Sequence, residues 1–288
     1  MTQSALLESS PDNRRSAKPS TRPGARTGDV QPIVPLHESG TRPPLYLLPS
    51  ADGSLSETRR LVRELGSDRP VLAFQPPTWP KEDPLTLPMM AQHYLLELDK
   101  RHPGGPVHLA GFGLGGPVAF EIARRLSADD RAASLFLIDT WTPTGSVPTP
   151  HSLLRGALHF AVNLPGWAIG NLQHHGIRLP LEWLFQLCSP SHRHHLRGLK
   201  PDDIQLALRQ VKAWRQYHPV KTELPATLFR SRISPLFRGV TPDTGWRTIL
   251  SDLEIRTLPG LPGRLLESTW VRPLAIQLRT LLSQHDRM

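Results

Sequence analysis

A short glycine-rich segment, Gly111-Phe112-Gly113-Leu114-Gly115, carries the clearest chemical signal in the sequence. It follows an apolar run and precedes a helical pattern, which is the strand–turn–helix context of the nucleophile elbow G-x-S-x-G. In an elbow the flanking glycines allow a tight turn, and the central serine is presented to an acyl carbonyl. The central residue here is Gly113, so the pattern predicts the turn without its nucleophile.

The same glycines permit a second interpretation. Gly111, Gly113 and Gly116 also satisfy G-x-G-x-x-G, the dinucleotide-binding fingerprint. That fingerprint follows the first strand of its unit and is paired with an acidic ribose ligand further on. The present turn follows the third predicted strand, and Asp139 is followed by Thr-Trp-Thr-Pro. We therefore predict no cofactor, while a structural glycine turn is compatible with either interpretation.

Alternating apolar runs and amphipathic stretches predict the elements that hold this turn. The predicted strands are Leu45–Leu48, Val71–Phe74, Val107–Ala110, Ser134–Ile138, Ala226–Phe229 and Leu253–Thr257. The predicted helices are Leu55–Leu65, Leu87–Arg101, Leu114–Leu126, Ile204–Tyr217 and Val271–Leu282. Continuous apolar strands between helices favour an α/β fold with a mostly parallel sheet covered on both faces. Such sheets bind ligands beyond the carboxyl ends of their strands.

The sequence divides into a tail and a domain, and the domain contains an insertion. Residues 1–40 are rich in Ser, Pro, Arg and Thr and are predicted to form a disordered tail. Residues 41–288 are long enough for one α/β domain with a full core. Within that domain, residues 144–202 interrupt the alternation and are predicted to form a helical lid over the site.

Several motifs follow one another in a fixed order along the chain. They are Pro32-Ile33-Val34-Pro35-Leu36, Pro43-Pro44-Leu45-Tyr46, Phe74-Gln75-Pro76-Pro77, Met90-Ala91-Gln92-His93-Tyr94, Gly105-Pro106-Val107-His108-Leu109-Ala110-Gly111 and Ala119-Phe120-Glu121-Ile122-Ala123. Their order and spacing resemble the thioesterase domains that release products from non-ribosomal peptide and polyketide synthases. The resemblance implies an α/β-hydrolase fold with a helical lid insertion, and an acyl chain or thioester-linked intermediate as ligand.

The resemblance also carries over the catalytic positions of that family. The serine position is Gly113, and the aspartate matches Asp139 just past a predicted strand. The family histidine falls in a P-G-x-H loop, where this chain has Pro262. In the triad the serine attacks, the histidine moves the proton and the aspartate orients the histidine. Only Asp139 is present, so we predict no hydrolysis by the usual triad.

Further residues are expected to line the pocket. The family has a P-x-A-G-G loop after its first strand, and the corresponding residues here include Ala51 and Asp52. Backbone N–H groups near Ala51 and Leu114 would hold an oxyanion. Asp52 either brings negative charge to that place or points to solvent. Trp141 and Arg264 are also expected to contact the substrate.

No residue stands out as a replacement for the missing serine or histidine. Cys188 lies in an apolar lid stretch and is expected to be inert. No base is identifiable for Ser50. The lid histidines include the cluster His192, His194 and His195, but without a neighbouring carboxylate a solvated basic segment is favoured over a metal site. We predict no metal, although one lid histidine reaching Asp139 stays open.

The net charge and the composition limit the classes of partner that we expect. The formal net charge is +9, and residues 151–200 hold five Lys or Arg against one acid, Glu182. Such a lid would steer an acidic acyl or peptidyl carrier protein. Basic residues are not interleaved with aromatics, so nucleic acid is not expected. One cysteine, no long apolar run and no signal-peptide pattern predict a cytoplasmic protein without membrane binding.

Three functions from different classes stay open. The sequence favours a non-hydrolytic accessory protein that binds an acyl chain or its carrier. The second is an enzyme of altered mechanism (a cyclase, lyase or isomerase) with Asp139 as general base. The third is a thioesterase hydrolase with relocated catalytic groups. The burial and pKa of Asp139, and the size of the cavity before it, discriminate the first two.

Overall fold

The computed structural model describes residues 31–50, 55–66, 68–77, 79–80, 83–129, 131, 133–143, 161–167, 201–233 and 241–287. Residues 1–30 and most of the predicted lid lie outside these ranges. The predictions for Ala51, Asp52, Cys188 and the lid histidines also fall outside them.

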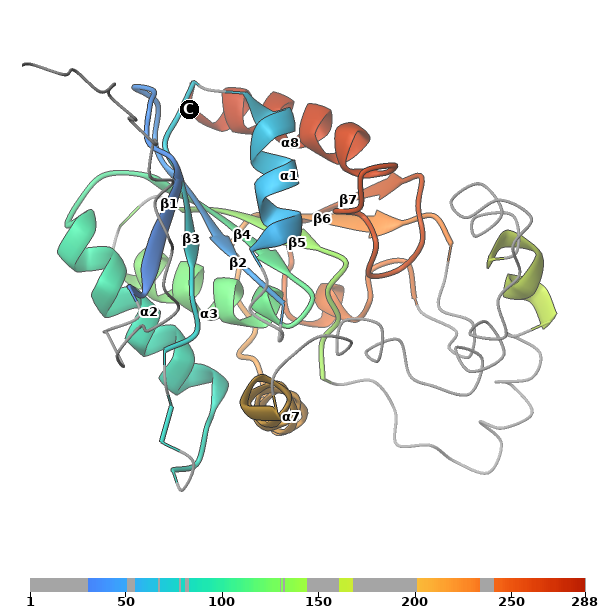
Figure 1. The fold of residues 1–288 in the computed structure, drawn as a ribbon, viewed down its shortest axis with the longest axis horizontal. Coiled ribbons are helices and arrows are strands. Elements are labelled where there is room, and N and C mark those ends of the chain that lie inside the picture. The colour runs from blue at the N-terminus through green and yellow to red at the C-terminus, as the bar shows by residue number, and fades with distance from the viewer. Residues whose placement is uncertain are drawn as a thin grey trace, which may run out of the picture.

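One seven-stranded sheet forms the centre of the molecule (Figure 1). Its strands are β1 (Ile33–His37), β2 (Leu45–Leu48), β3 (Val71–Phe74), β4 (Val107–Phe112), β5 (Ala133–Ile138), β6 (Ala226–Ser231) and β7 (Leu253–Leu258). The spatial order is β1-β3-β2-β4-β5-β6-β7, so β4 is the central strand. Every described neighbour pair is parallel except β1 with β3. The prediction of a mostly parallel sheet is confirmed.

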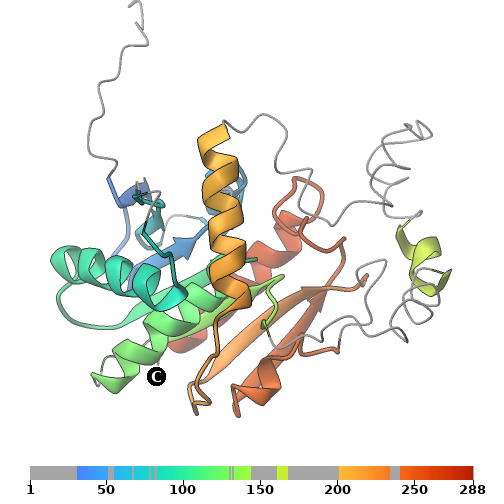
Figure 2. The ribbon, with the colours of Figure 1, turned by 90° about the horizontal axis from the view of Figure 1, so that it is seen from below.

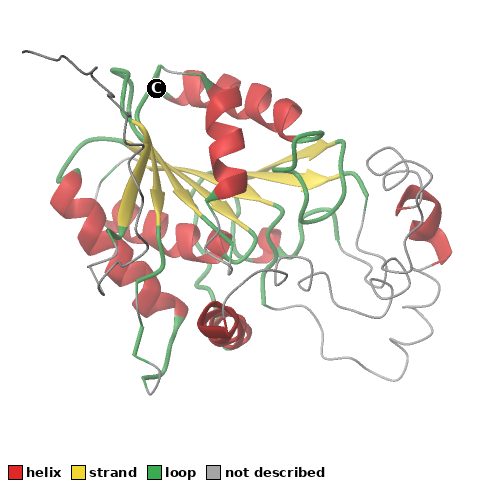
Figure 3. Ribbon diagram, viewed as in Figure 1, coloured by secondary structure: helices red, strands yellow, loops and turns green. Residues whose placement is uncertain are grey.

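Helices cover both faces of the sheet (Figure 1; Figure 2). On one face lie α1 (Ser56–Leu65) and α8 (Val271–His285). On the other lie α2 (Leu87–Arg101), α3 (Gly115–Ala128) and α7 (Pro201–Arg215). Figure 3 shows the resulting three layers, with the strands between the two sets of helices.

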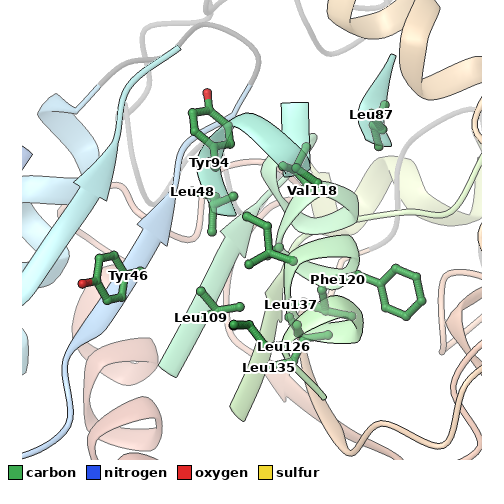
Figure 4. Packing of buried hydrophobic residues seen from close by; sticks show 14 of the residues in the cluster. Tyr46, Leu48, Leu87, Tyr94, Leu109, Val118, Phe120, Leu126, Leu135 and Leu137 are labelled. Carbon is green, nitrogen blue, oxygen red and sulfur yellow. The ribbon is translucent and has the colours of Figure 1, made fainter. Parts of the chain in front are cut away.

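The two cores follow from the alternation of side chains along each strand. In β2, Tyr46 and Leu48 pack with α2 and α3, whereas Leu45 and Leu47 pack with α1 and α8. All four are nearly inaccessible to solvent. Figure 4 shows Tyr46 and Leu48 among the leucines of β4, β5 and α3. Because both faces are buried, the strand reads as an uninterrupted apolar run.

The boundary predicted at residue 40 is wrong, because β1 lies inside the predicted tail. β1 pairs antiparallel with β3 at the edge of the sheet. It is short, mostly half-buried and contains Pro35, which an edge strand tolerates. The other predicted strands and helices are confirmed, with ends that differ by a few residues. Within the described part of the chain, no helix combines the length and apolarity that crossing a bilayer requires.

Candidate functional site

The glycine-rich turn lies where β4 ends and α3 begins, at the carboxyl end of the central strand. Gly113 has φ of +47°, and its N–H donates to the carbonyl oxygen of Ile138 at 3.1 Å. This left-handed conformation costs another residue ~1–2 kcal/mol but costs glycine little. The turn therefore keeps the backbone shape in which an elbow presents a side chain, and presents none.

The glycine after the turn lets the helix approach a neighbouring strand closely. An ideal Cβ on Gly115 would lie 2.4 Å from the carbonyl oxygen of Leu48, at the end of β2. Real Cβ atoms essentially never approach another atom so closely. The first turn of α3 thus abuts the end of the strand beside β4, and this fixes the helix N-terminus over the sheet edge.

Asp139 follows β5, the strand on the other side of β4. Its Oδ1 accepts a hydrogen bond from the Ser231 N–H at 3.0 Å, and its Oδ2 accepts one from the Gly263 N–H at 2.9 Å. Asp139 is 5% exposed and has φ of +45°, a strained value for a residue with a side chain. Burial raises its pKa to about 6, although the two backbone hydrogen bonds oppose the rise.

A shallow hollow adjoins Asp139, with room for about one water molecule. Its lining residues are Asp139, Thr140, Trp141, Leu228, Arg230, Ser231, Ile233, Thr244 and Pro262. The residues carried over to the aspartate and histidine positions therefore meet at one pocket, together with Trp141. Arg264 is not among these residues, and its Nε lies 3.6 Å from Glu267 Oε1. The catalytic and substrate-contact roles of these residues stay predictions.

A second pocket, with room for about one water molecule, lies between the end of β2 and the start of α3. Its lining residues are Leu48, Pro49, Ser50, Pro76, Met90, Tyr94, Leu114, Gly115, Val118 and Gln210. Leu114 was expected in a pocket, whereas Gln210 was missed. The available signal was a polar residue between Ala207 and Ala213 on the buried stripe of α7.

A serine–imidazole hydrogen bond exists elsewhere in the described structure, but far along the strands from Gly113. His285 Nδ1 lies 2.8 Å from Ser134 Oγ, near the start of β5. Gly113 follows the end of the neighbouring parallel strand, at the opposite edge of the sheet. This pair therefore caps the amino end of the sheet and does not face the glycine turn. Among the described residues, no three His, Cys, Asp or Glu side chains gather as metal ligands.

A central parallel sheet, a strand–turn–helix elbow and an acid after the next strand define an α/β-hydrolase fold. Solved thioesterases share it. The NocB thioesterase domain from the nocardicin cluster superposes with a TM-score of 0.61 at 20% identity, over 88% of this chain and 100% of that one. RedJ thioesterase from the prodiginine pathway of Streptomyces coelicolor gives a TM-score of 0.54 at 20% identity, over 84% and 89%. At these identities the likeness establishes the fold.

Sequence comparison finds a family model that matches the central segment. Residues 43–155 match the family model described as "Thioesterase domain". Atromentin synthetase of Tapinella panuoides is 31% identical over 106 residues, which are 36% of this chain and 11% of that protein. Enterobactin synthase component F of Escherichia coli is 34% identical over 114 residues, 38% and 9%. These matches span only about a tenth of each relative. The resemblance to synthase thioesterase domains is confirmed.

Proposed function

We propose that this protein binds an acyl chain, or a carrier protein that bears one, without hydrolysing the thioester. The observation that carries the proposal is that backbone groups, and not a histidine, hold the carboxylate of Asp139. Both of its oxygens accept hydrogen bonds from backbone N–H groups, and the loop residue that shares its pocket is Pro262. In a working triad the carboxylate orients a histidine, which removes the proton of the serine. Gly113 and Pro262 supply neither group.

The kinds of protein that this chain is similar to support a proposal about the pathway. The matched relatives include a dimodular nonribosomal peptide synthase of Bacillus subtilis and a bikaverin polyketide synthase of Gibberella fujikuroi. We place the protein in biosynthesis of the same type. The ligand would then be an intermediate held as a thioester on a carrier protein.

The carrier itself is proposed to be acidic, because the chain has a net charge of +9. The affinity of this protein for the carrier should fall as ionic strength rises. Charge reversal at Arg193 and Arg197, two arginines of the predicted lid, should weaken binding further. Binding that is indifferent to salt and to both reversals would remove the charged carrier from the proposal and leave the acyl chain.

One observation favours a second candidate, an enzyme that uses Asp139 as general base in a cyclase, lyase or isomerase reaction. A carboxylate with a pKa of about 6 is a better base near neutral pH than an ordinary aspartate. Against this, each carboxylate oxygen of Asp139 already accepts a hydrogen bond from a backbone N–H group. Product formation that rises with pH through about 6 and disappears in Asp139→Asn would establish the second candidate in place of the first.

The binding proposal is tested with hexanoyl-N-acetylcysteamine, a short thioester that mimics the end of a carrier's prosthetic arm. Titration calorimetry should show saturable binding, and mass spectrometry of the mixture after incubation should recover the thioester intact. The same test with a hexanoyl-loaded carrier protein covers a ligand that needs the carrier. Failure to bind either form would contradict the proposal.

A further inference from the structure

One long edge of β7 has no strand beside it in the described structure. Among the described strands β7 pairs with β6 alone, and it lies at the end of the sheet opposite β1 (Figure 1). The N–H and C=O groups along such an edge can pair with another strand, so proteins usually block edges with proline, a bulge or charges. The edge strand β1 contains Pro35 and a shift of register between Pro35 and His37. β7 contains neither a proline nor a register shift, so charge is the remaining device.

The pairing with β6 shows which backbone groups of β7 point outward. The Ala226 N–H donates to the carbonyl oxygen of Asp252 at 3.0 Å, so the backbone groups of Asp252 face β6. Because successive residues of a strand alternate in direction, every second residue after Asp252 also faces β6. The backbone groups that point away from β6 are those of Leu253, Ile255 and Thr257, and no hydrogen bond joins them to another described residue.

The side chains of β7 form two rows, one on each face of the strand. Glu254 and Arg256 lie on one face, with Glu254 Oε1 at 2.7 Å from Arg256 Nη2. On the other face Ile255 is half-buried against the core and Thr257 is exposed. Reversing the direction of the strand about Ile255 exchanges Glu254 with Arg256. The charges of β7 are therefore complementary to those of the same strand running in the opposite direction.

We propose that β7 pairs antiparallel with β7 of a second copy of this chain, about a two-fold axis at Ile255. The outward N–H and C=O groups of Ile255 would bond to those of Ile255 in the second copy, and Leu253 would pair with Thr257. Each Glu254 would lie directly opposite an Arg256, where opposite charges stabilise a strand pair. This complementarity to its own reversal favours a second copy over a strand of a different protein.

The proposed pairing joins the two seven-stranded sheets into one. The paired strands run in opposite directions, so the two candidate sites lie at opposite edges of the joined sheet and stay separate. A contact between two six-residue strands is small, and we expect the dimer to dissociate in the micromolar range. Because a two-fold contact uses the same patch on both copies, it closes at the dimer and forms no larger species.

Sedimentation equilibrium over about a hundredfold range of protein concentration measures this association. The wild type should give a monomer–dimer equilibrium. Thr257→Pro removes an outward N–H and places a ring on the edge, so dimerisation should weaken by about tenfold or more. Thr257→Ala is the matched control, because it keeps the N–H and should dimerise as the wild type does. Circular dichroism and the unfolding midpoint show that each variant is folded.

The two charges provide a test that a change within one chain cannot imitate. Glu254→Arg places like charges opposite one another twice in the dimer, and Arg256→Glu does the same, so each variant alone should dimerise about tenfold more weakly. An equal mixture of the two variants should associate as the wild type does, because every heterodimer again pairs opposite charges. The ion pair within the strand is lost in both variants and in their mixture, so it cannot cause the recovery.

A wild type that stays monomeric at every concentration would overturn the proposal, whatever other strand the edge binds. A dimer that survives Thr257→Pro would also overturn it, as would a mixture of the two charge variants that associates no better than either alone. Thioester binding is measured separately on the same protein, so these results leave the proposed function standing.

Discussion

The aspartates at the two ends of the sheet have pKa values shifted in opposite directions. At the amino end, Asp286 accepts hydrogen bonds from Arg69 Nη2 at 2.7 Å and lies 2.9 Å from His108 Nε2. Burial alone would raise its pKa, but these partners outweigh burial and lower the pKa to about 2. At the carboxyl end, burial wins and the pKa of Asp139 rises to about 6. The surroundings at the amino end therefore stabilise the charged form of Asp286, whereas those at the carboxyl end destabilise the charged form of Asp139.

One end of the sheet thus contributes to the stability of the fold, whereas the other holds the candidate site. Arg69 is only 4% exposed, and it ties the segment before β3 to the residue that follows α8. At the other end, Asp139 has a left-handed φ of +45°. Strained residues collect at ligand sites. Variants at the two ends test this contrast.

The largest expected effect is at the amino end. Asp286→Ala removes the main partner of the buried Arg69 guanidinium and leaves it only the half-exposed Asp68 carboxylate, 3.4 Å from its Nε. This should lower the free energy of unfolding by about 3 kcal/mol in urea titrations. The surface pair of Lys100 with Glu97 is the control, because its lysine is 70% exposed. Glu97→Gln should cost ~0.5 kcal/mol or less. Similar losses in both variants would remove the distinction between the buried network and an ordinary ion pair.

The next effect concerns the pH dependence of stability. Folding raises the pKa of Asp139 from 3.8 to about 6, so its contribution is most favourable below pH 3.8 and is lost as pH rises through about 6. The stability of the wild type relative to Asp139→Asn should therefore fall by ~3 kcal/mol between pH 4 and pH 7. Paired urea titrations across this range measure it. A constant difference would mean that Asp139 titrates normally.

The amino end should show the reverse slope. Because the folded pKa of Asp286 is lowered to about 2, its contribution is present above pH 3.8 and is lost as pH falls through about 2. The stability of the wild type relative to Asp286→Asn should therefore increase between pH 2 and pH 4, by ~2 kcal/mol. Guanidinium titrations of the two proteins are the measurement. Slopes of the same sign at both ends would break the comparison.

A smaller effect separates two glycines of the turn. Gly115→Ala places a Cβ against a backbone carbonyl that cannot rotate away, so it should cost ~2–3 kcal/mol of unfolding free energy. Gly113→Ala meets only the end of a flexible side chain and should cost ~1–2 kcal/mol for its left-handed backbone. The reverse ranking in thermal or chemical unfolding would contradict the close approach of α3 to β2.

The sequence predicted the regular elements better than the site. The helix over Leu87–Arg101 was predicted to the residue, since Thr86 caps it by accepting from the Met89 N–H and its apolar stripe is continuous. The strand over Ile33–His37 was missed because an edge strand with one buried residue carries little periodicity. The elements that reach the core leave a pattern in the sequence, and those at the edge do not.

Two positions of the site could be predicted, but the contacts around them could not. Gly113 and Asp139 follow adjacent strands, so their placement could be predicted from the α/β alternation. The donors to Asp139 are Ser231, the last residue of β6, and Gly263, in the loop after β7. Gln210 reaches its pocket from a helix beyond the predicted lid. Such contacts depend on how distant segments pack, which local patterns do not specify.

The smallest expected effect is that of Gly113→Ser on activity. A serine there has no histidine to remove its proton, and its Cβ would meet the Ser50 hydroxyl. We expect no thioester hydrolysis above background from this variant, and detectable turnover only when Pro262→His and Ser50→Ala are added, because the groups act as a unit. Substantial turnover by the single variant would mean that another base lies beside the turn.

The most direct test of non-hydrolytic acyl binding is the rate of thiol release from hexanoyl-N-acetylcysteamine across a range of substrate concentrations. Wild-type protein should match Gly113→Ala, with no saturation and no rate above the uncatalysed reaction. Saturable thiol release by the wild type that Asp139→Asn abolishes would contradict it, because the retained aspartate would then be supporting catalysis.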